Sequence, residues 1–266
     1  MIPARKRWGQ HFLVRGETAE KIVEAARLRP QETVVEVGPG DGALTRPIAA
    51  RVSQLLAIEI DPLRAKVLAE EFAGADGVRV LCGDVLDQSF GEWLAGAGFR
   101  LPATLVSNLP YNVATPILVA AIEEPRAIGR SIATVQREVA RRLCAKPGDE
   151  AYGYLSVRVA AHATARVLFD LPPGAFRPRP KVVSSVVELR PREDLVEVSL
   201  RDRALILASH AFRSRRKTLA NALASLGERR VWEAALARSG WGPRTRGEEL
   251  SFENYVALAR DGEPPS

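Results

Sequence analysis

The chain has 266 residues, of which 46% are hydrophobic, and a formal net charge of +6. This length allows one large domain plus a small one, and this apolar share can fill a core, which excludes a disordered or low-complexity chain. No apolar run approaches the roughly 20 residues needed to cross a bilayer, and none follows the charged N-terminus, so neither a membrane span nor a secretory signal is expected. The positive charge favours a polyanionic partner.

The two cysteines, Cys82 and Cys144, lie far apart and form no CxxC pair. This spacing argues against a disulfide framework and against a zinc site, so we expect no metal and a reducing, cytoplasmic location.

The first two-thirds of the chain alternates short apolar runs with helical patterns. Short apolar runs are typical of strands that are buried on both faces of a parallel sheet. The strands are predicted at Thr33–Val37, Leu55–Ile60, Val78–Leu81, Thr104–Ser107 and Ser131–Val135. The helices between them are predicted at Gly42–Arg51, Leu63–Phe72, Thr115–Glu123 and Arg137–Cys144. This order predicts a doubly wound, mostly parallel α/β sheet.

The pattern changes after residue 150. Three late strands are predicted at Ser156–Ala161, Arg166–Asp170 and Ser184–Leu189, followed by a charged linker at Arg190–Asp194. Helical patterns follow at Ala204–Ala211, Thr218–Leu226, Val231–Arg238 and Phe252–Arg260. We therefore expect an α/β domain over residues 1–194 and a small all-α domain over 195–266.

A glycine-rich turn follows the first of these strands, with Gly38, Gly40 and Gly42 in a GxGxG spacing. Glycine lets the backbone approach a ligand, and the next helix points free N–H groups at it. Dinucleotide sites use GxGxxG, so this spacing favours S-adenosylmethionine over NAD. The competing interpretation is a tight strand-to-helix turn without a ligand.

Carboxylates end the next two strands. Glu59 can accept both hydroxyl hydrogens of a ribose, and Asp84 can accept the amino group of an adenine while the N–H of Val85 reaches a ring nitrogen. The alternatives are a solvated carboxylate for Glu59 and a helix cap or turn for Asp84. Asp61 is predicted to be a cap, because Pro62 follows at a first-turn position.

The fourth strand ends in Asn108-Leu109-Pro110-Tyr111. The amino nitrogen of adenine is a poor nucleophile because its lone pair is delocalised into the ring. The amide oxygen of Asn108 and the carbonyl of Leu109 can accept its N–H bonds and favour a pyramidal nitrogen, and these bonds strengthen as positive charge develops. Pro110 biases Leu109 towards an extended backbone, and Tyr111 can stack on a flipped base. The alternative is an ordinary Asn-x-Pro turn.

This tetrapeptide resembles motif IV of the adenine-N6 methyltransferases. The N-terminal Lys6–Leu13 and the loop Phe176–Val182 resemble signatures of the ribosomal RNA adenine dimethyltransferases. Three further segments resemble sequences that are specific to the small-subunit (KsgA/RsmA) branch: Asn108–Leu118, Lys146-Pro147-Gly148 to Ser156, and Phe212–Leu219. Together these motifs extend from about residue 5 to about residue 260.

The resemblance implies a Rossmann-like class I methyltransferase that uses S-adenosylmethionine and releases S-adenosylhomocysteine. Its expected substrate is the small ribosomal subunit, where it transfers two methyl groups to each of two adjacent adenosines near the 3′ end of 16S rRNA. It also implies donor contacts at His11, Leu13, Gly38, Glu59, Asp84 and Asn108, with the contact of His11 through its backbone. Phe176 is expected to border the target base opposite Tyr111, and Lys181 to reach phosphate. We expect a monomer.

A basic run, Arg213-Ser214-Arg215-Arg216-Lys217, is predicted to open a helix of the C-terminal domain and to contact the rRNA backbone. A second patch is expected at Arg5, Lys6 and Arg7 beside Trp8. The alternative interpretation of the C-terminal run is a solvated helix face.

Three other functions fit parts of the sequence. A large-subunit rRNA methyltransferase of the antibiotic-resistance class would use the same site, but the Asn108–Pro116 stretch and the basic C-terminal run favour the small subunit. A non-catalytic RNA-binding assembly or transcription factor is disfavoured by the intact Asn108–Tyr111 motif. A nicotinamide oxidoreductase is disfavoured by the GxGxG spacing.

Overall fold

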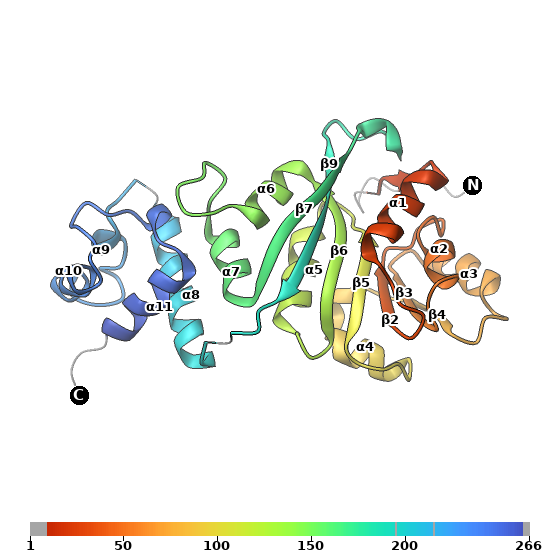
Figure 1. The fold of residues 1–266 in the computed structure, drawn as a ribbon, viewed down its shortest axis with the longest axis horizontal. Coiled ribbons are helices and arrows are strands. Elements are labelled where there is room, and N and C mark those ends of the chain that lie inside the picture. Colours follow the sequence, from red (N-terminus) through yellow and green to blue (C-terminus); the bar gives the residue numbers. More distant parts are fainter. Residues whose placement is uncertain (1–9, 195, 215, 263–266) are drawn as a thin grey trace. The chain divides into compact units, whose positions relative to one another are not determined.

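The computed structural model describes residues 10–194, 196–214 and 216–262 and divides into two compact units (Figure 1). The first unit comprises residues up to Ala140 together with Ala165–Pro191, and the second comprises Arg141–Thr164 and the chain from Arg192 onward. No helix in the described ranges has the length and apolar character that crossing a membrane requires.

A seven-stranded sheet forms the centre of the first unit, in the order β4-β3-β2-β5-β6-β9-β7. Its strands are β2 (Thr33–Val37), β3 (Gln54–Glu59), β4 (Val78–Cys82), β5 (Ala103–Asn108), β6 (Ile128–Gln136), β7 (Ala163–Leu171) and β9 (Ser184–Pro191). The pairs from β4 through β6 are parallel, and β9 runs antiparallel to β6. The predicted doubly wound, mostly parallel α/β sheet is confirmed.

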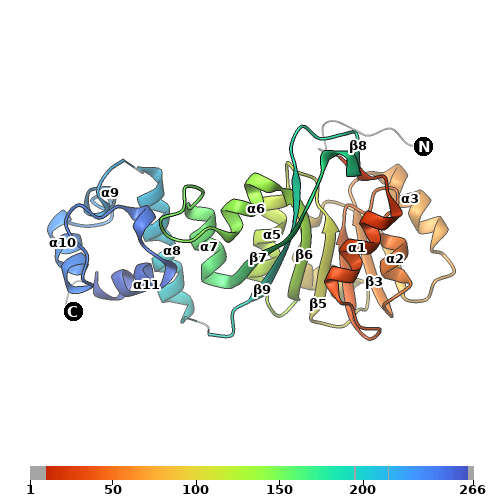
Figure 2. The same ribbon diagram turned by 45° about the horizontal axis from the view of Figure 1, so that its top comes forward.

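Helices cover both faces of this sheet, with α1 in front of the strands and α5 behind them in Figures 1 and 2. The helices of this unit are α1 (Gly16–Ala26), α2 (Thr45–Ala49), α3 (Pro62–Glu71), α4 (Phe90–Gly96) and α5 (Ala114–Glu123), with short 3-10 turns at Val85–Asp87 and Pro173–Ala175. Ile22 of α1 packs with Val34, Leu55 and Val106 of three strands in one buried cluster. Burial of these aliphatic side chains holds α1 on the sheet.

The N-terminal segment joins a separate two-stranded sheet. Strand β1 (Phe12–Leu13) pairs antiparallel with β8 (Phe176–Arg177), and the N–H of Val14 donates to the carbonyl of Ala175 at 3.0 Å. This pairing, which the sequence patterns did not predict, brings residues 11–14 beside a loop more than 160 positions later in the chain.

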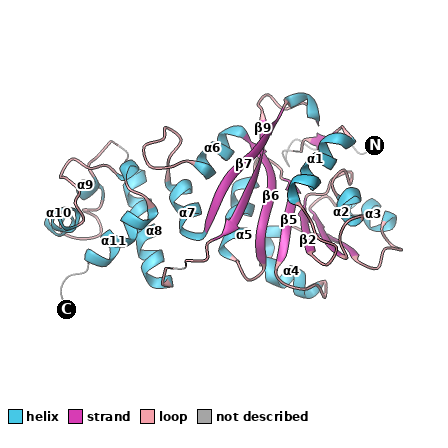
Figure 3. Ribbon diagram, viewed as in Figure 1, coloured by secondary structure: helices cyan, strands magenta, loops and turns pink. Residues whose placement is uncertain are grey.

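The second unit is helical (Figure 3). It contains α7 (Tyr154–His162), α8 (Val198–Arg213), α9 (Leu219–Ala222), α10 (Arg229–Arg238), a 3-10 turn at Gly247–Glu249 and α11 (Phe252–Asp261); α6 (Arg137–Cys144) begins at the end of the first unit. Val157 and Ala161 of α7 are buried in one cluster with Ala208 of α8 and Tyr255 of α11. The hydroxyl of Tyr152 donates to the carbonyl of Leu250 at 2.8 Å, and that of Tyr255 to Gly247 at 2.8 Å.

The strand predicted at Ser156–Ala161 is wrong, because this segment lies in helix α7. Its β-branched valines suggested a strand, but Val157 and Ala161 stand four residues apart and so share the buried face of a helix. The expected linker at Arg190–Asp194 begins with two residues of β9, and residues 141–164 join the second unit although the expected boundary at 194/195 assigned them to the first. Helices α1 and α4 were not anticipated.

Val157→Ala is expected to lower the free energy of unfolding of the second unit by about 2 kcal/mol, because it removes two fully buried carbons and leaves a cavity. Val198→Ala is the matched control, since Val198 lies in the same unit but is exposed, and its effect is expected within about 0.5 kcal/mol. Urea titration followed by circular dichroism measures both. Equal stability of the two variants would contradict the buried helical placement of Val157.

Candidate active site at the carboxyl end of the sheet

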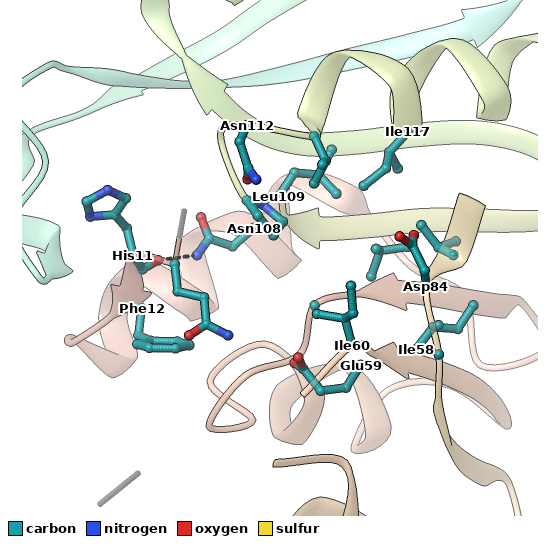
Figure 4. Close-up of a pocket in the computed structure, with 17 residues that line it drawn as sticks. His11, Phe12, Ile58, Glu59, Ile60, Asp84, Asn108, Leu109, Asn112 and Ile117 are labelled. Atoms are coloured by element: carbon teal, nitrogen blue, oxygen red, sulfur yellow. Dashed lines mark hydrogen bonds between the residues drawn. The ribbon is translucent and has the colours of Figure 1, made fainter. Parts of the chain in front are cut away.

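A pocket lies where strands β2, β3, β4 and β5 end (Figure 4). Its lining comes from the N-terminal segment, the strand ends and the start of α5: Gln10, His11, Phe12, Val37, Gly38, Ile58, Glu59, Ile60, Gly83, Asp84, Val85, Asn108, Leu109, Pro110, Asn112, Val113 and Ile117. Parallel strands direct their carboxyl ends to one edge, which is where ligands bind in open α/β sheets.

The glycine turn borders this pocket in a conformation that other residues rarely adopt. Gly38, Gly40 and Gly42 have φ angles of +68°, +59° and +80°. A Cβ on Gly40 would lie 2.6 Å from a ring carbon of Phe12. Gly40 therefore serves two needs, a left-handed backbone and room for an aromatic ring from the N-terminal segment.

Glu59 fastens this turn to the end of β3. One of its carboxylate oxygens accepts the N–H of Gly40 at 2.9 Å, and the other accepts the N–H of Asp61 at 2.9 Å. The side chain is buried, which raises its pKa above the usual value against the lowering effect of those two bonds. A carboxylate has about four acceptor sites, so Glu59 can hold the turn and still accept a ligand hydroxyl.

A buried arginine that the motif analysis missed supports the same turn. Arg64 of α3 forms an ion pair with Asp41, and its guanidinium carbon lies 4.2 Å from the centre of the Phe12 ring. Asp61 lies 3.8 Å from the Arg64 Nε, and its side chain accepts the N–H of Leu63 at 3.1 Å. The prediction that Asp61 caps a helix is confirmed. Arg64 thus joins the glycine turn to the N-terminal segment by charge and by cation–π contact.

Asp84 lines the opposite wall of the pocket from Phe12 (Figure 4). It also accepts the N–H of Leu86 at 3.0 Å, so the capping and ligand-binding interpretations are compatible. Val85 is buried in the same wall, and its carbonyl accepts the indole N–H of Trp93 at 3.1 Å.

Asn108 has a fixed amide orientation. Its Nδ2 donates to the carbonyl of His11 at 2.8 Å, and its Oδ1 is buried without a hydrogen-bond partner among the described residues (Figure 4). An unpaired buried acceptor costs stability unless a ligand supplies a donor. The nearby Leu109 and Pro110 also line the pocket.

Tyr111 is held by two neighbours. Its ring stacks on that of His11 with centroids 5.0 Å apart, and its hydroxyl is hydrogen-bonded to Ser184 at the start of β9. Burial raises the pKa of Tyr111 above its usual value, so the phenol stays protonated. The His11 Nδ1 lies 2.6 Å from the carbonyl of Pro178, and His11 therefore bridges Tyr111 and the loop after β8.

Several predicted site residues lie outside the pocket lining. Leu13 and Phe176 face each other across the β1–β8 pair and are buried in the apolar cluster under α1, with Phe176 only 3% exposed. Phe176 is thus packed into the core of the first unit, and its role beside a base stays a prediction. Lys181 is exposed on the loop that follows. Phe12 and Gln10, which the motif analysis did not single out, do line the pocket.

The basic C-terminal run does not open a helix, contrary to expectation. Arg213 is the last residue of α8, while Arg216 and Lys217 are exposed in the connection that precedes α9. The short connection ends at Leu219, which is fully buried and anchors α9. Arg215 and the patch of Arg5, Lys6, Arg7 and Trp8 lie outside the described residues.

Glu36 is a second buried carboxyl group, one residue before the end of β2. Burial raises its pKa to about 8, and the charge of the nearby Glu59 adds to this shift. In the ranges that the structure describes, no cluster of three or more His, Cys, Asp or Glu side chains is arranged to hold a metal ion.

The strand order, the left-handed glycine turn and the strand-end carboxylates define a Rossmann-like methyltransferase. The family model for ribosomal RNA adenine dimethylase matches residues 1–260. This chain belongs to that family.

Several similar proteins align with nearly the whole length of this chain. The ribosomal RNA small subunit methyltransferase A of Synechococcus elongatus is 40% identical over 99% of this chain and 97% of its own, and that of Moorella thermoacetica is 41% identical over 98% and 92%. Among solved structures, the 23S rRNA methyltransferase ErmE is 29% identical with a TM-score of 0.72, covering 94% of this chain and 98% of its own. A dimethyladenosine transferase from Plasmodium falciparum shares the fold, with a TM-score of 0.79 at 21% identity over 93% and 96% of the two chains.

Gly40→Ala is expected to weaken binding of S-adenosylmethionine at least tenfold, because the new methyl group displaces the Phe12 ring and strains the turn. Gly98→Ala is the control, since Gly98 has a φ of +70° but no neighbouring atom within 4 Å. Gly98→Ala therefore introduces the same backbone strain as Gly40→Ala but no steric clash with a neighbouring side chain. Calorimetric titration of both variants with the donor measures the difference; equal affinities would show that the Phe12 contact is dispensable.

Glu36 makes stability depend on pH. Because its pKa is near 8 in the folded protein and near 4.5 in the unfolded chain, the folded state holds the proton more tightly. Its contribution is fully present below pH 4.5 and is lost as the pH rises through 8, at up to about 1.4 kcal/mol per pH unit. Glu36→Gln should remove this decline, whereas Glu70→Gln, at an exposed position on α3, should retain it. Urea unfolding between pH 5 and 8.5 provides the measurement, and parallel pH profiles of wild type and Glu36→Gln would contradict the assignment.

Proposed function

We propose that this protein transfers methyl groups from S-adenosylmethionine to the N6 amino groups of two adjacent adenosines near the 3′ end of 16S rRNA in the small ribosomal subunit. The observation that carries this proposal is the buried, unpaired Oδ1 of Asn108 in the pocket at the strand ends. An amino N–H from a flipped adenine is the kind of donor that this acceptor lacks.

The residues fit the proposed methyl donor. Gly38, which lines the pocket, and Gly40, whose N–H binds Glu59, let the backbone approach its methionine part. Glu59 accepts from the ribose hydroxyls, and Asp84 with the N–H of Val85 meets the adenine ring. Since a Cβ at residue 40 would intrude on Phe12, this cradle depends on the absence of a side chain there. When bound, a sulfonium donor supplies an electrophilic methyl group that needs no activation by the protein.

The protein therefore has to activate the acceptor nitrogen. Asn108 Oδ1 and the carbonyl of Leu109 accept the two N–H bonds of the amino group, which favours a pyramidal nitrogen and releases its lone pair for in-line attack. Both bonds strengthen as the nitrogen becomes cationic, so they stabilise the transition state more than the ground state. The carbonyl of His11 holds the amide in the required orientation by binding Nδ2. Solvent then takes the proton, and no general base is needed.

Tyr111 forms one wall of the proposed base site. Its ring is held by His11 and Ser184, and preorganisation of this kind lowers the entropy cost of stacking a flipped base. Phe176 is assigned the opposite side, which requires the β8 loop to turn outward a ring that is packed inward in the structure.

Contacts with the RNA backbone are assigned to exposed cations. Lys181 lies on the loop after β8, and the C-terminal run contributes Arg213, Arg215, Arg216 and Lys217. Relatives named as small-subunit enzymes reach 40–41% identity, above the 29% of ErmE, which supports the small subunit over the large one. We assign the protein to the cytoplasm, where ribosomes assemble, and propose that it acts as a monomer.

Asn108→Ala is expected to reduce dimethyladenosine formation on small subunits at least a thousandfold, because both the acceptor and the oriented amide are lost. The affinity for S-adenosylmethionine should change only a few fold. Asn112→Ala is the control, because Asn112 lines the same pocket beyond the motif and should retain most of the activity. Mass spectrometry of the methylated rRNA and donor calorimetry are the two measurements.

Near-normal methylation by Asn108→Ala would overturn the proposed mechanism. A large loss of donor affinity without a further loss of turnover would instead make Asn108 a donor-binding residue. Methylation of isolated large-subunit RNA in preference to small subunits would contradict the proposed substrate.

A further inference from the structure

A second hollow lies in the C-terminal unit, in a part of the molecule that takes no role in methyl transfer. It has a volume of about 510 Å³ and is lined by residues of α8, of α10, of the turn before α10 and of the end of α11. The lining residues are Arg203, Ile206, Leu207, Leu226, Gly227, Glu228, Val231, Trp232 and Gly262. This volume lies within the range of sites that hold small organic groups.

The indole of Trp232 is the aromatic group of the lining, and two glycines make room for it. A Cβ on Gly262 would lie 2.5 Å from the indole ring, and a Cβ on Gly227 would lie 3.4 Å from its Nε1. This Nε1–H is buried and has no hydrogen-bond partner in the described part of the chain. A ligand that brought an acceptor would satisfy a donor that the protein alone leaves unpaired.

The mouth of the hollow is apolar and open to solvent. Ile206 is 51% exposed and Leu226 is 39% exposed, although both have large aliphatic side chains. The charged residues Arg203 and Glu228 line the same hollow. Apolar walls with a few polar groups at the rim suit a flat ring that carries donors and acceptors along its edge.

The segment that contains the hollow is basic. In the sequence, residues 198–238, which include α8 and α10, carry nine Lys and Arg against three Asp and Glu, an excess equal to the net charge of the whole chain. A segment with this charge attracts a polyanion and disfavours a basic peptide. A partner with apolar flat rings on a polyanionic backbone is a nucleic acid.

We propose that this hollow captures an unstacked base of the ribosomal RNA, at a distance along the RNA from the adenosines that are methylated. The base inserts between Ile206 and Leu226. The exposed Arg229 and Arg230 of α10, which pair with Glu233 and Glu228 in the structure, meet the flanking phosphates when RNA is bound. Unpaired bases in loops and bulges are the elements by which proteins recognise folded RNA, and insertion of one ring removes its apolar faces from water. The inference rests on rRNA being the substrate but does not depend on the chemistry at Asn108.

Ile206→Asp tests the proposal, since it places a charge in the mouth of the hollow at an exposed position that the fold tolerates. Its affinity for small ribosomal subunits is expected to fall about tenfold, consistent with the loss of one inserted base. Val198→Asp is the matched control, because it introduces the same charge at a site on the same helix that is 57% exposed and outside the hollow. Its affinity should stay within twofold of wild type, and equal losses in the two variants would overturn the proposal.

A photoreactive amino acid at Leu226 identifies the occupant directly. Irradiation of its complex with small subunits should join residue 226 to an rRNA nucleotide in a loop, bulge or strand end. A crosslink to a ribosomal protein, or to paired RNA alone, would overturn the proposal. Calorimetry with S-adenosylmethionine verifies that each variant has an intact first unit. If wild type methylates small subunits while Ile206→Asp binds them equally well, the base-capture proposal fails and the proposed function stands.

Discussion

The ring of Phe12 occupies the space that a side chain at residue 40 would take, and most of the candidate site depends on this contact. It seats the N-terminal segment on the glycine turn, with the guanidinium of Arg64 on the ring. One residue earlier, the carbonyl of His11 then reaches the amide of Asn108. The absence of a Cβ at Gly40, shortly after the end of β2, therefore helps to set the orientation of the Asn108 amide at the end of β5.

Buried carboxyl groups stabilise the same region because the backbone compensates for their burial. Glu59 receives two N–H bonds, one from the glycine turn and one from Asp61, while the buried Asp61 and the partly exposed Asp41 neighbour the buried Arg64. Removing such groups from water is costly unless donors or an opposite charge replace the solvent. Glu36 is buried beside Glu59, and its pKa is raised to about 8, so the carboxyl group keeps its proton near neutral pH and this edge of the sheet does not gather full negative charge.

The two units pose different recognition problems. Attack on an amino nitrogen requires atoms fixed to within a fraction of an ångström, which the end of β5 provides because this strand is paired with β2 on one side and β6 on the other. Holding a large RNA requires charge and shape spread over a wide surface. The second unit fits that need through its concentration of arginine and lysine and its open apolar hollow.

The sequence by itself determined the parallel strands, the glycine turn, the strand-end carboxylates and the Asn108–Tyr111 motif, because each is written in a short continuous stretch. Strands buried on both faces must be apolar throughout, and a left-handed turn favours glycine. These features can therefore be recognised from a few consecutive residues. Only the tertiary structure decided that Ser156–Ala161 is a helix, that Phe12 and Arg64 support the site, and that Phe176 packs inward. Each of these depends on partners distant in the chain, since packing across such distances outweighs the weak conformational preference of any one segment.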